Sequence, residues 1–110
     1  MSSNLEEQFH AAMLQIYELA ARLKPPYRAT RFLQMVQSQG GKAAADQLLS
    51  TSNPSDGFTE LFFRGKENLK LSVEYLVLQA PWSELFSQDQ LAKARKRLLD
   101  VKCSLPPECQ

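Results

Sequence analysis

Apolar residues recur every three or four positions from the start of the chain to the double proline Pro25-Pro26. This spacing gives a helix one apolar face, so it predicts an amphipathic α-helix. We expect the helix to end before Pro25-Pro26, with Arg22 and Lys24 in its last turn. The apolar stripe consists of Leu5, Phe9, Ala12, Met13, Ile16, Ala20 and Leu23.

Two further helices are predicted on either side of Gly40-Gly41. Residues 28–39 form the first of them, and its inner face carries Phe32, Leu33, Val36 and Met35. The glycines end this helix, because glycine adopts a positive φ at little cost. Residues 42–50 form the second, and the alanines at 43–45 allow a neighbouring helix to approach closely.

The stretch from residue 55 to residue 86 is the richest in large apolar side chains. It holds six of the ten aromatic residues, namely Phe58, Phe62, Phe63, Tyr75, Trp82 and Phe86. Burial of apolar area drives folding, so we expect Phe58, Phe62, Trp82 and Phe86 to lie in the core. A short helix capped by Ser55 or Asp56 and stopped by Gly65 accounts for the beginning of this stretch.

Residues 69–77 fit two structures. Leu69, Leu71, Val73, Tyr75 and Val77 alternate with polar residues as a strand would, whereas Val73, Leu76 and Val77 also fit a helix capped by Ser72. We favour the helix, because no second strand is predicted with which a first could pair.

The last predicted helix covers residues 88–102. Ser87 followed by Gln90 is a capping box, and the apolar positions are Leu91, Ala94, Leu98 and Val101. The chain is therefore expected to be all-α, with five to seven short helices packed orthogonally in one compact domain and no sheet. The domain is expected to cover residues 1–102, and residues 103–110 to be a flexible C-terminal tail.

Composition fits a single domain of this kind. A chain of 110 residues with 44% hydrophobic and 23% charged residues is typical of a globular protein. No apolar run reaches the length of about 20 residues that crosses a membrane, and the polar start MSSNLEEQF does not resemble a secretory signal. We expect a cytoplasmic protein whose two cysteines, Cys103 and Cys109, are reduced thiols.

Residues that would support catalysis are few. His10 is the single histidine, and it has no partner at metal-ligand spacing. None of the four glycines belongs to a phosphate-binding G-x-x-x-x-G-K motif. The sequence therefore predicts a binding module and not an enzyme, with no cofactor, no metal and no small-molecule substrate. An enzyme would use the acidic residues around Asp56 and Glu60 with a metal.

Two kinds of partner are compatible with the sequence. A protein partner or self-association would need an exposed apolar patch, for which Met13, Tyr17, Met35 and Phe63 are the candidates.

The alternative is weak, sequence-independent binding to nucleic acid. The candidate residues are Lys93, Lys96 and Arg97 on one helical face, with Arg28 and Arg31 as a possible extension of it. The same cluster would also suit the solvated C-terminus of a helix. A net charge of only +1 argues against strong attraction of a polyanion.

Several motifs resemble those of a group of small all-helical bacterial proteins of unassigned function. They are the Gly40-Gly41 junction, YRATRFLQ, S-D-G-hydrophobic-T, S-V-E, W-x-x-L-F and A-x-x-R-L. The matching positions are Gly40, Gly41, Ser55, Asp56, Gly57, Phe58, Thr59, Ser72, Val73, Glu74, Trp82, Leu85, Phe86, Ala94, Arg97 and Leu98. The run Phe62-Phe63-Arg64 departs from the pattern, which has a Trp-Glu pair there. The resemblance implies an all-helical fold. Members of the group sometimes stand near restriction or defence genes, which implies a DNA-associated role.

Overall fold

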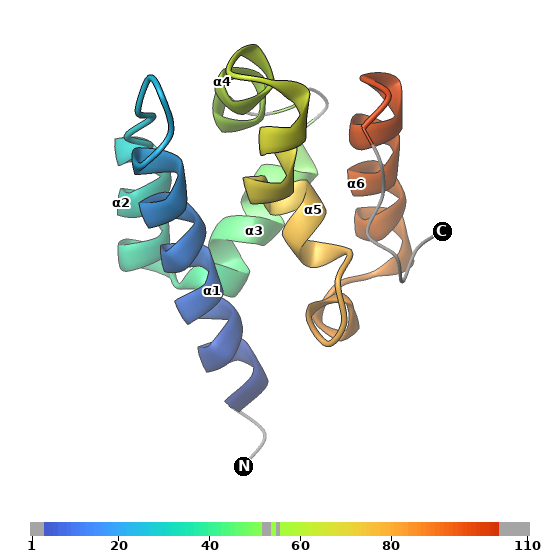
Figure 1. Ribbon diagram of the computed structural model, residues 1–110. Helices are drawn as coiled ribbons and strands as arrows, with labels where there is room; N and C mark the ends of the chain where they lie inside the picture. Colours follow the sequence, from blue (N-terminus) through green and yellow to red (C-terminus); the bar gives the residue numbers. More distant parts are fainter. Residues whose placement is uncertain (1–3, 52–53, 55, 104–110) are drawn as a thin grey trace.

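Six α-helices and two short 3-10 helices make up the part of the chain that the computed structural model describes, residues 4–51, 54 and 56–103 (Figure 1). The elements are α1 (Asn4–Ala21), α2 (Thr30–Gln39), α3 (Gly41–Ser50), α4 (Asp56–Phe63), η1 (Lys66–Leu71), α5 (Val73–Val77), η2 (Trp82–Leu85) and α6 (Gln88–Asp100). No strand occurs among these described residues, which confirms the all-α prediction. The helix α3 lies at the centre, since it packs against α1, α2, α5 and α6.

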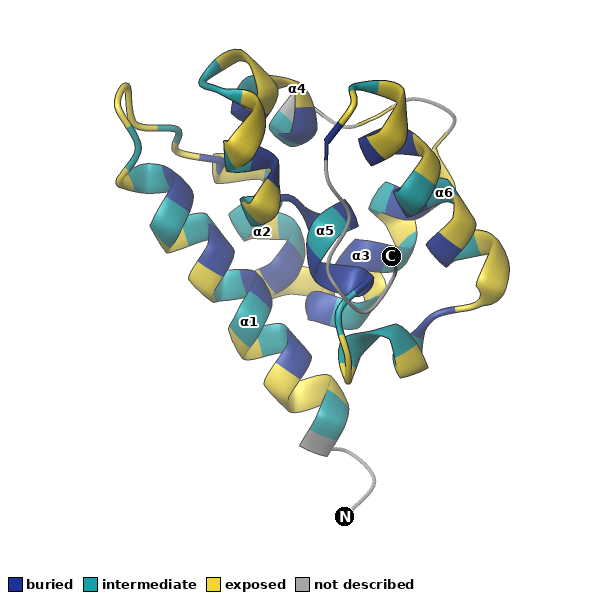
Figure 2. Ribbon diagram, turned by 45° about the vertical axis from the view of Figure 1, so that its right-hand side comes forward, coloured by how far each residue is buried: buried dark blue, intermediate teal, exposed yellow. Residues whose placement is uncertain are grey.

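The apolar stripe of α1 faces the core as its spacing predicts. Phe9, Met13, Ile16 and Ala20 are all buried, and Figure 2 shows the buried positions recurring along one side of the helix. The helix ends at Ala21, so the prediction that Arg22 and Lys24 lie in its last turn is wrong. The carbonyl of Ala20 accepts hydrogen bonds from the backbone N–H groups of Leu23 and Tyr27, and these bonds turn the chain toward α2.

The two glycines between α2 and α3 have different structural roles. Gly40 has φ +92° and ψ 154°, a backbone conformation that is almost restricted to glycine. Gly41 is the first residue of α3, and its N–H donates to Nδ1 of His10 over 2.9 Å. A Cβ on Gly41 would lie 2.7 Å from the Cα of His10. The absent side chain therefore allows α3 to approach the backbone of α1. Of the three alanines expected at a helix contact, Ala44 and Ala45 are buried and Ala43 is exposed.

The helix α4 buries only part of its aromatic surface. Phe58 and Leu61 are buried, but Phe62 is 37% exposed and Phe63 is 75% exposed. The prediction that Phe62 lies in the core is therefore wrong. Phe58 and Leu61 are one helical turn apart and face the core, whereas Phe62 is rotated by about 100° from Leu61 around the helix axis.

Residues 69–77 are helical, as we expected in preference to a strand. The chain forms η1, then the capping residue Ser72, then α5. The Ser72 hydroxyl oxygen accepts a hydrogen bond from the backbone N–H of Tyr75 over 3.2 Å. It donates to the carbonyl of Leu69 over 2.6 Å, so a single buried hydroxyl ends η1 and begins α5.

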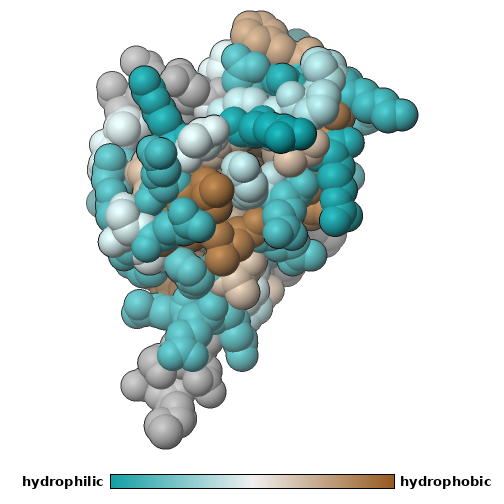
Figure 3. Space-filling view, turned by 90° about the vertical axis from the view of Figure 1, so that its left-hand side faces the viewer, coloured by the Kyte–Doolittle hydropathy of each residue, from teal (hydrophilic) through white to brown (hydrophobic). Residues whose placement is uncertain are grey.

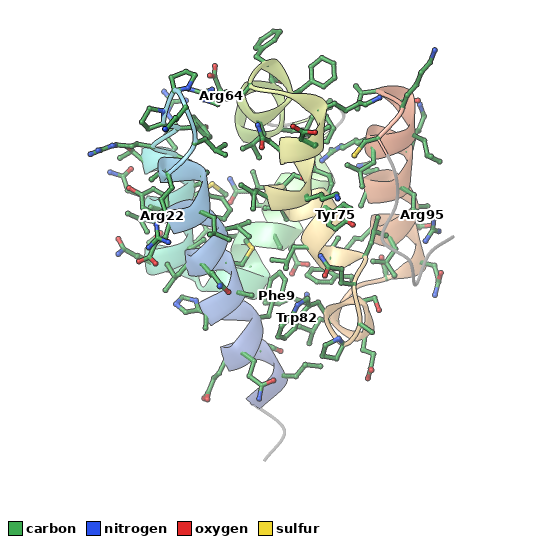
Figure 4. The ribbon with its side chains drawn as sticks, in the orientation of Figure 1. Phe9, Arg22, Arg64, Tyr75, Trp82 and Arg95 are labelled. Carbon is green, nitrogen blue, oxygen red and sulfur yellow. The ribbon has the colours of Figure 1, made fainter. Side chains whose placement is uncertain are left out.

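An aromatic cluster connects the N-terminal helix to the segment before α6. The ring of Phe9 meets the rings of Trp82 and Phe86 edge-on, with centroids 5.8 and 5.4 Å apart, and Figure 4 shows Phe9 beside Trp82. Phe86 is buried as predicted. Trp82 packs against the core but is only half-buried, so it is less buried than we expected.

The capping box at the start of α6 is confirmed by both of its hydrogen bonds. The N–H of Gln90 donates to Oγ of Ser87, and the N–H of Ser87 donates to Oε1 of Gln90. Cys103 is buried in the core, so the packed domain extends beyond the expected boundary at residue 102. The rest of the expected tail, residues 104–110, lies outside the described residues, as does Ser55, one of the proposed caps of α4.

The close contact between α1 and α3 predicts that replacing Gly41 by alanine lowers the free energy of unfolding. A glycine-to-alanine change at a compatible backbone conformation usually stabilises a protein by about 0.4–1 kcal/mol. Gly41→Ala should instead destabilise it by about 1–3 kcal/mol, because the new methyl group would push α3 away from His10.

Urea denaturation measures this difference in the free energy of unfolding. Ala43→Ser, an exposed substitution on the same helix, should stay within about 0.5 kcal/mol of the wild type. An increase in stability on Gly41→Ala would contradict the close approach of the two helices.

Candidate functional site

A cavity of about 410 Å³ opens between α1, α2 and α4, and residues at the junction of η1 with α5 also line it. Its walls are mostly apolar, with contributions from Ile16, Ala20, Phe58, Leu61 and Val73. The side of the molecule on which α2 lies exposes apolar side chains framed by polar ones (Figure 3). Concave sites that bind ligands or partner side chains have this combination of apolar walls and few polar groups.

Polar and aromatic side chains surround the opening of this cavity. Arg28 and Arg31 line it and are both exposed, so their guanidinium groups are accessible from solvent. Tyr17 and Tyr27 also line it and are half-buried. The opening therefore combines two cations with two aromatic rings above an apolar interior.

Arg64 fixes the loop that forms one edge of the opening. Its Nε donates to the carbonyl of Pro25 over 2.7 Å, and its Nη2 donates to the carbonyl of Pro26 over 3.2 Å. Its Nη1 forms an ion pair with Glu60 of α4 over 2.7 Å. Its guanidinium carbon lies 5.1 Å from the ring centre of Tyr27, and Figure 4 shows Arg64, the residue after α4, on the side of α4 that faces this loop. The α1–α2 loop and α4 are thereby held together before any ligand binds.

A buried ion pair includes Glu74, one of the residues that line the cavity. Nη1 of Arg97 is 2.8 Å from Oε2 of Glu74, and the two residues are only 5% and 2% exposed. Arg97 also donates to the carbonyl of Leu48, to the carbonyl of Thr51 and to the hydroxyl of Thr51. The guanidinium of Arg97 therefore joins α6 to α5 and to the end of α3.

Burial raises the pKa of Glu74, and the hydrogen bond and positive charge of Arg97 oppose that change. A raised carboxyl pKa in a cavity is one mark of a catalytic acid. The described lining residues, however, include no second acidic residue and no histidine or cysteine.

The structure separates the basic residues that the sequence suggested for nucleic-acid binding. Arg97 is buried, so it is not part of an exposed basic face. Lys96 pairs with Asp100 over 3.0 Å, and Nζ of Lys93 donates to the carbonyl of Ser50 over 3.3 Å. Arg28 and Arg31 precede or begin α2, which lies on the opposite side of the molecule from α6 in Figure 1. Nucleic-acid binding by these residues stays a prediction, and one combined basic patch is not what the fold presents.

The histidine and the described cysteine have structural surroundings in this fold. His10 uses Nδ1 to accept the N–H of Gly41, and no cluster of three or more metal-ligand side chains occurs among the described residues. Burial raises the pKa of the Cys103 thiol, which lowers the fraction of reactive thiolate. Cys109 lies outside the described residues. Within the described part of the chain, no helix is both long and apolar enough to cross a membrane.

Comparison of the chain with protein-family models, curated protein sequences and solved structures found no match. The resemblance to small bacterial proteins therefore stays a prediction. Several positions of its motifs have structural roles in this fold. Ser72 caps α5, Glu74 pairs with Arg97, and Phe86 packs on Phe9.

The raised pKa of Glu74 predicts a pH effect on stability. A carboxyl group whose pKa is higher in the folded state contributes its full stabilisation below the unfolded-state pKa, near 4.5, and loses it as the pH rises through the folded-state pKa. The free energy of unfolding of the wild type relative to Glu74→Gln should therefore fall as the pH rises above about 4.5.

Urea denaturation of both proteins between acidic and neutral pH measures this difference. Glu67→Gln, a change at an exposed acidic residue of η1, is the control. The free energy of unfolding of the wild type relative to this control should not change with pH. A relative stability of the wild type that increases with pH would mean that pairing with Arg97 outweighs the effect of burial.

The nucleic-acid hypothesis makes a separate prediction for Lys93 and Lys96 of α6. Fluorescence anisotropy with a labelled duplex and a labelled single strand should detect binding at low salt, and raised salt should weaken it. A Lys93→Ala/Lys96→Ala variant should lose most of this binding, while an Arg28→Ala/Arg31→Ala variant should change it less. No binding at low salt, or binding that the α6 variant retains, would discard these residues as a nucleic-acid site.

Proposed function

We propose that this protein is a non-enzymatic binding module whose cavity between α1, α2 and α4 takes apolar side chains of a protein partner. The cavity of about 410 Å³ with its apolar walls is the observation that supports this proposal. Its size falls in the range of roughly 300–1,000 Å³ that is typical of binding sites.

The residues around the cavity favour a protein as the partner. Of the four candidates for an exposed apolar patch, Met13 is buried and is excluded. Tyr17 and Met35 line the cavity, and Phe63 is exposed on α4, the helix that supplies one cavity wall. Aromatic residues and methionine are enriched at protein interfaces, so Tyr17 and Met35 in the cavity lining fit contact with another protein.

The non-enzymatic part of the proposal rests on the ionisable groups around the cavity. Glu74 is the one acidic group among the described lining residues, and its carboxylate is bound by Arg97. Both groups are therefore engaged in holding the helices together. The expected cytoplasmic location and bacterial origin belong to the same proposal.

A peptide selection tests the proposal directly. A displayed library of random 16-residue peptides is selected against the folded protein, and enriched peptides are measured by isothermal titration calorimetry. We expect enrichment of apolar residues and a contact surface, mapped by amide chemical shifts, that centres on Tyr17, Met35 and Phe58. Thr30→Trp should abolish binding, because Thr30 is exposed and lines the opening that the indole would fill.

Gln37→Trp is the matched control, since Gln37 is exposed on the same helix but does not line the cavity. It should leave binding unchanged within a factor of about 2, as surface substitutions away from a site usually do. Light scattering over a dilution series tests whether a second copy of the chain occupies the cavity instead. Failure to enrich any peptide, or equal binding by Thr30→Trp and the wild type, would overturn the proposal.

A further inference from the structure

We infer that the partner segment is an acidic amphipathic helix, with apolar side chains in the cavity and carboxylates beside Arg28 and Arg31. This inference rests on the proposed function and specifies the chemistry of the partner. Two independent features of the site support it, namely the charge at the opening and the helical walls.

The charge at the opening is positive and uncompensated by the described residues. Residues 22–31, which include the α1–α2 loop, contain four cations, Arg22, Lys24, Arg28 and Arg31, and no acidic residue. No ion pair of the described residues involves Arg28 or Arg31. Glu74, the described acidic residue of the cavity, is already paired with Arg97. The two exposed guanidinium groups are therefore available to a carboxylate of the partner.

Guanidinium groups bind carboxylates through charge-assisted and often bidentate hydrogen bonds. Such contacts at the edge of an apolar site mainly select the partner and accelerate its association, while apolar contacts supply most of the affinity. An apolar segment flanked by Asp or Glu satisfies both parts of the site. A basic or neutral apolar segment would leave Arg28 and Arg31 facing like charge or none.

The walls of the cavity favour a helix over an extended segment. Extended peptides are commonly recruited by pairing with the edge of a sheet, and the described residues contain no strand. The cavity lies between helices, and the loop between α1 and α2 is held to α4 by Arg64. A helix laid between such walls presents apolar anchors at i, i+3, i+4 and i+7 on the side that enters the cavity.

Charge-matched peptides test the inference. Peptides enriched in the selection are resynthesised in three forms, with their original Asp and Glu, with Asn and Gln, and with Lys at those positions. We expect the acidic form to bind the wild type roughly 10-fold more tightly than the amide form, and its affinity to fall as salt is raised. Circular dichroism should show an increase in helix content when the acidic form binds.

Charge reversal on the protein supplies the second arm of the test. Arg28→Glu/Arg31→Glu should bind the acidic form roughly 10-fold or more weakly than the wild type does, and should gain affinity for the lysine form. Lys93→Glu/Lys96→Glu on α6 is the matched control, because it changes the net charge equally on the other side of the molecule, and should leave the affinities nearly unaltered.

The outcomes separate this inference from the proposed function. Equal binding of all three peptide forms, together with loss of binding in Thr30→Trp, would overturn the inference that the partner is acidic and leave the cavity as the binding site. Binding without a gain of helix content would overturn the inference that the bound segment is helical. Failure of every peptide to bind the wild type would overturn both proposals.

Discussion

The buried contact between Glu74 and Arg97 is the interaction on which the arrangement of the second half of the chain depends. One guanidinium bonds to a carboxylate of α5, to two backbone carbonyls at the end of α3 and to a threonine hydroxyl. Loss of either charged partner would leave an uncompensated buried charge, which typically costs about 3–5 kcal/mol. The pair also directs α6 onto the core, because Arg97 can reach these acceptors only when its side of the helix faces inward.

The first half of the chain is held by contacts of a different kind. Gly41 brings the backbone of α3 against α1, and His10 accepts the otherwise unpaired N–H at the start of α3. Arg64 binds the α1–α2 loop through the carbonyls of Pro25 and Pro26 and so holds this loop close to α4. The cavity is lined by helices that these contacts hold in place. Its walls are held in place by contacts that no partner has to supply, so binding need not be preceded by ordering of the site.

The proposed function follows from which polar groups are occupied and which are accessible. In the basic cluster of Lys93, Lys96 and Arg97, the side chain of Arg97 is buried in the core and Lys96 is paired with Asp100. Arg28 and Arg31, which sequence reasoning treated as an extension of that cluster, lie instead at the opening of an apolar cavity. Their position beside Tyr17 and Tyr27 makes a protein segment with apolar and acidic residues the best-matched partner.

Local patterns in the sequence predicted the six α-helices but not all of their ends, because each helix depends mainly on neighbours a few residues away. The spacing of Phe9, Met13 and Ile16 predicted α1, and the hydroxyls of Ser72 and Ser87 predicted the starts of α5 and α6. Tertiary structure alone decided that Arg97 is buried, since its carboxylate partner lies 23 positions earlier in the chain. It also created the cavity, whose lining comes from α1, α2, α4 and α5, with further residues of the α1–α2 loop, α3 and η1. No periodicity within one segment can encode such a site, because the site exists only where side chains from separate helices meet.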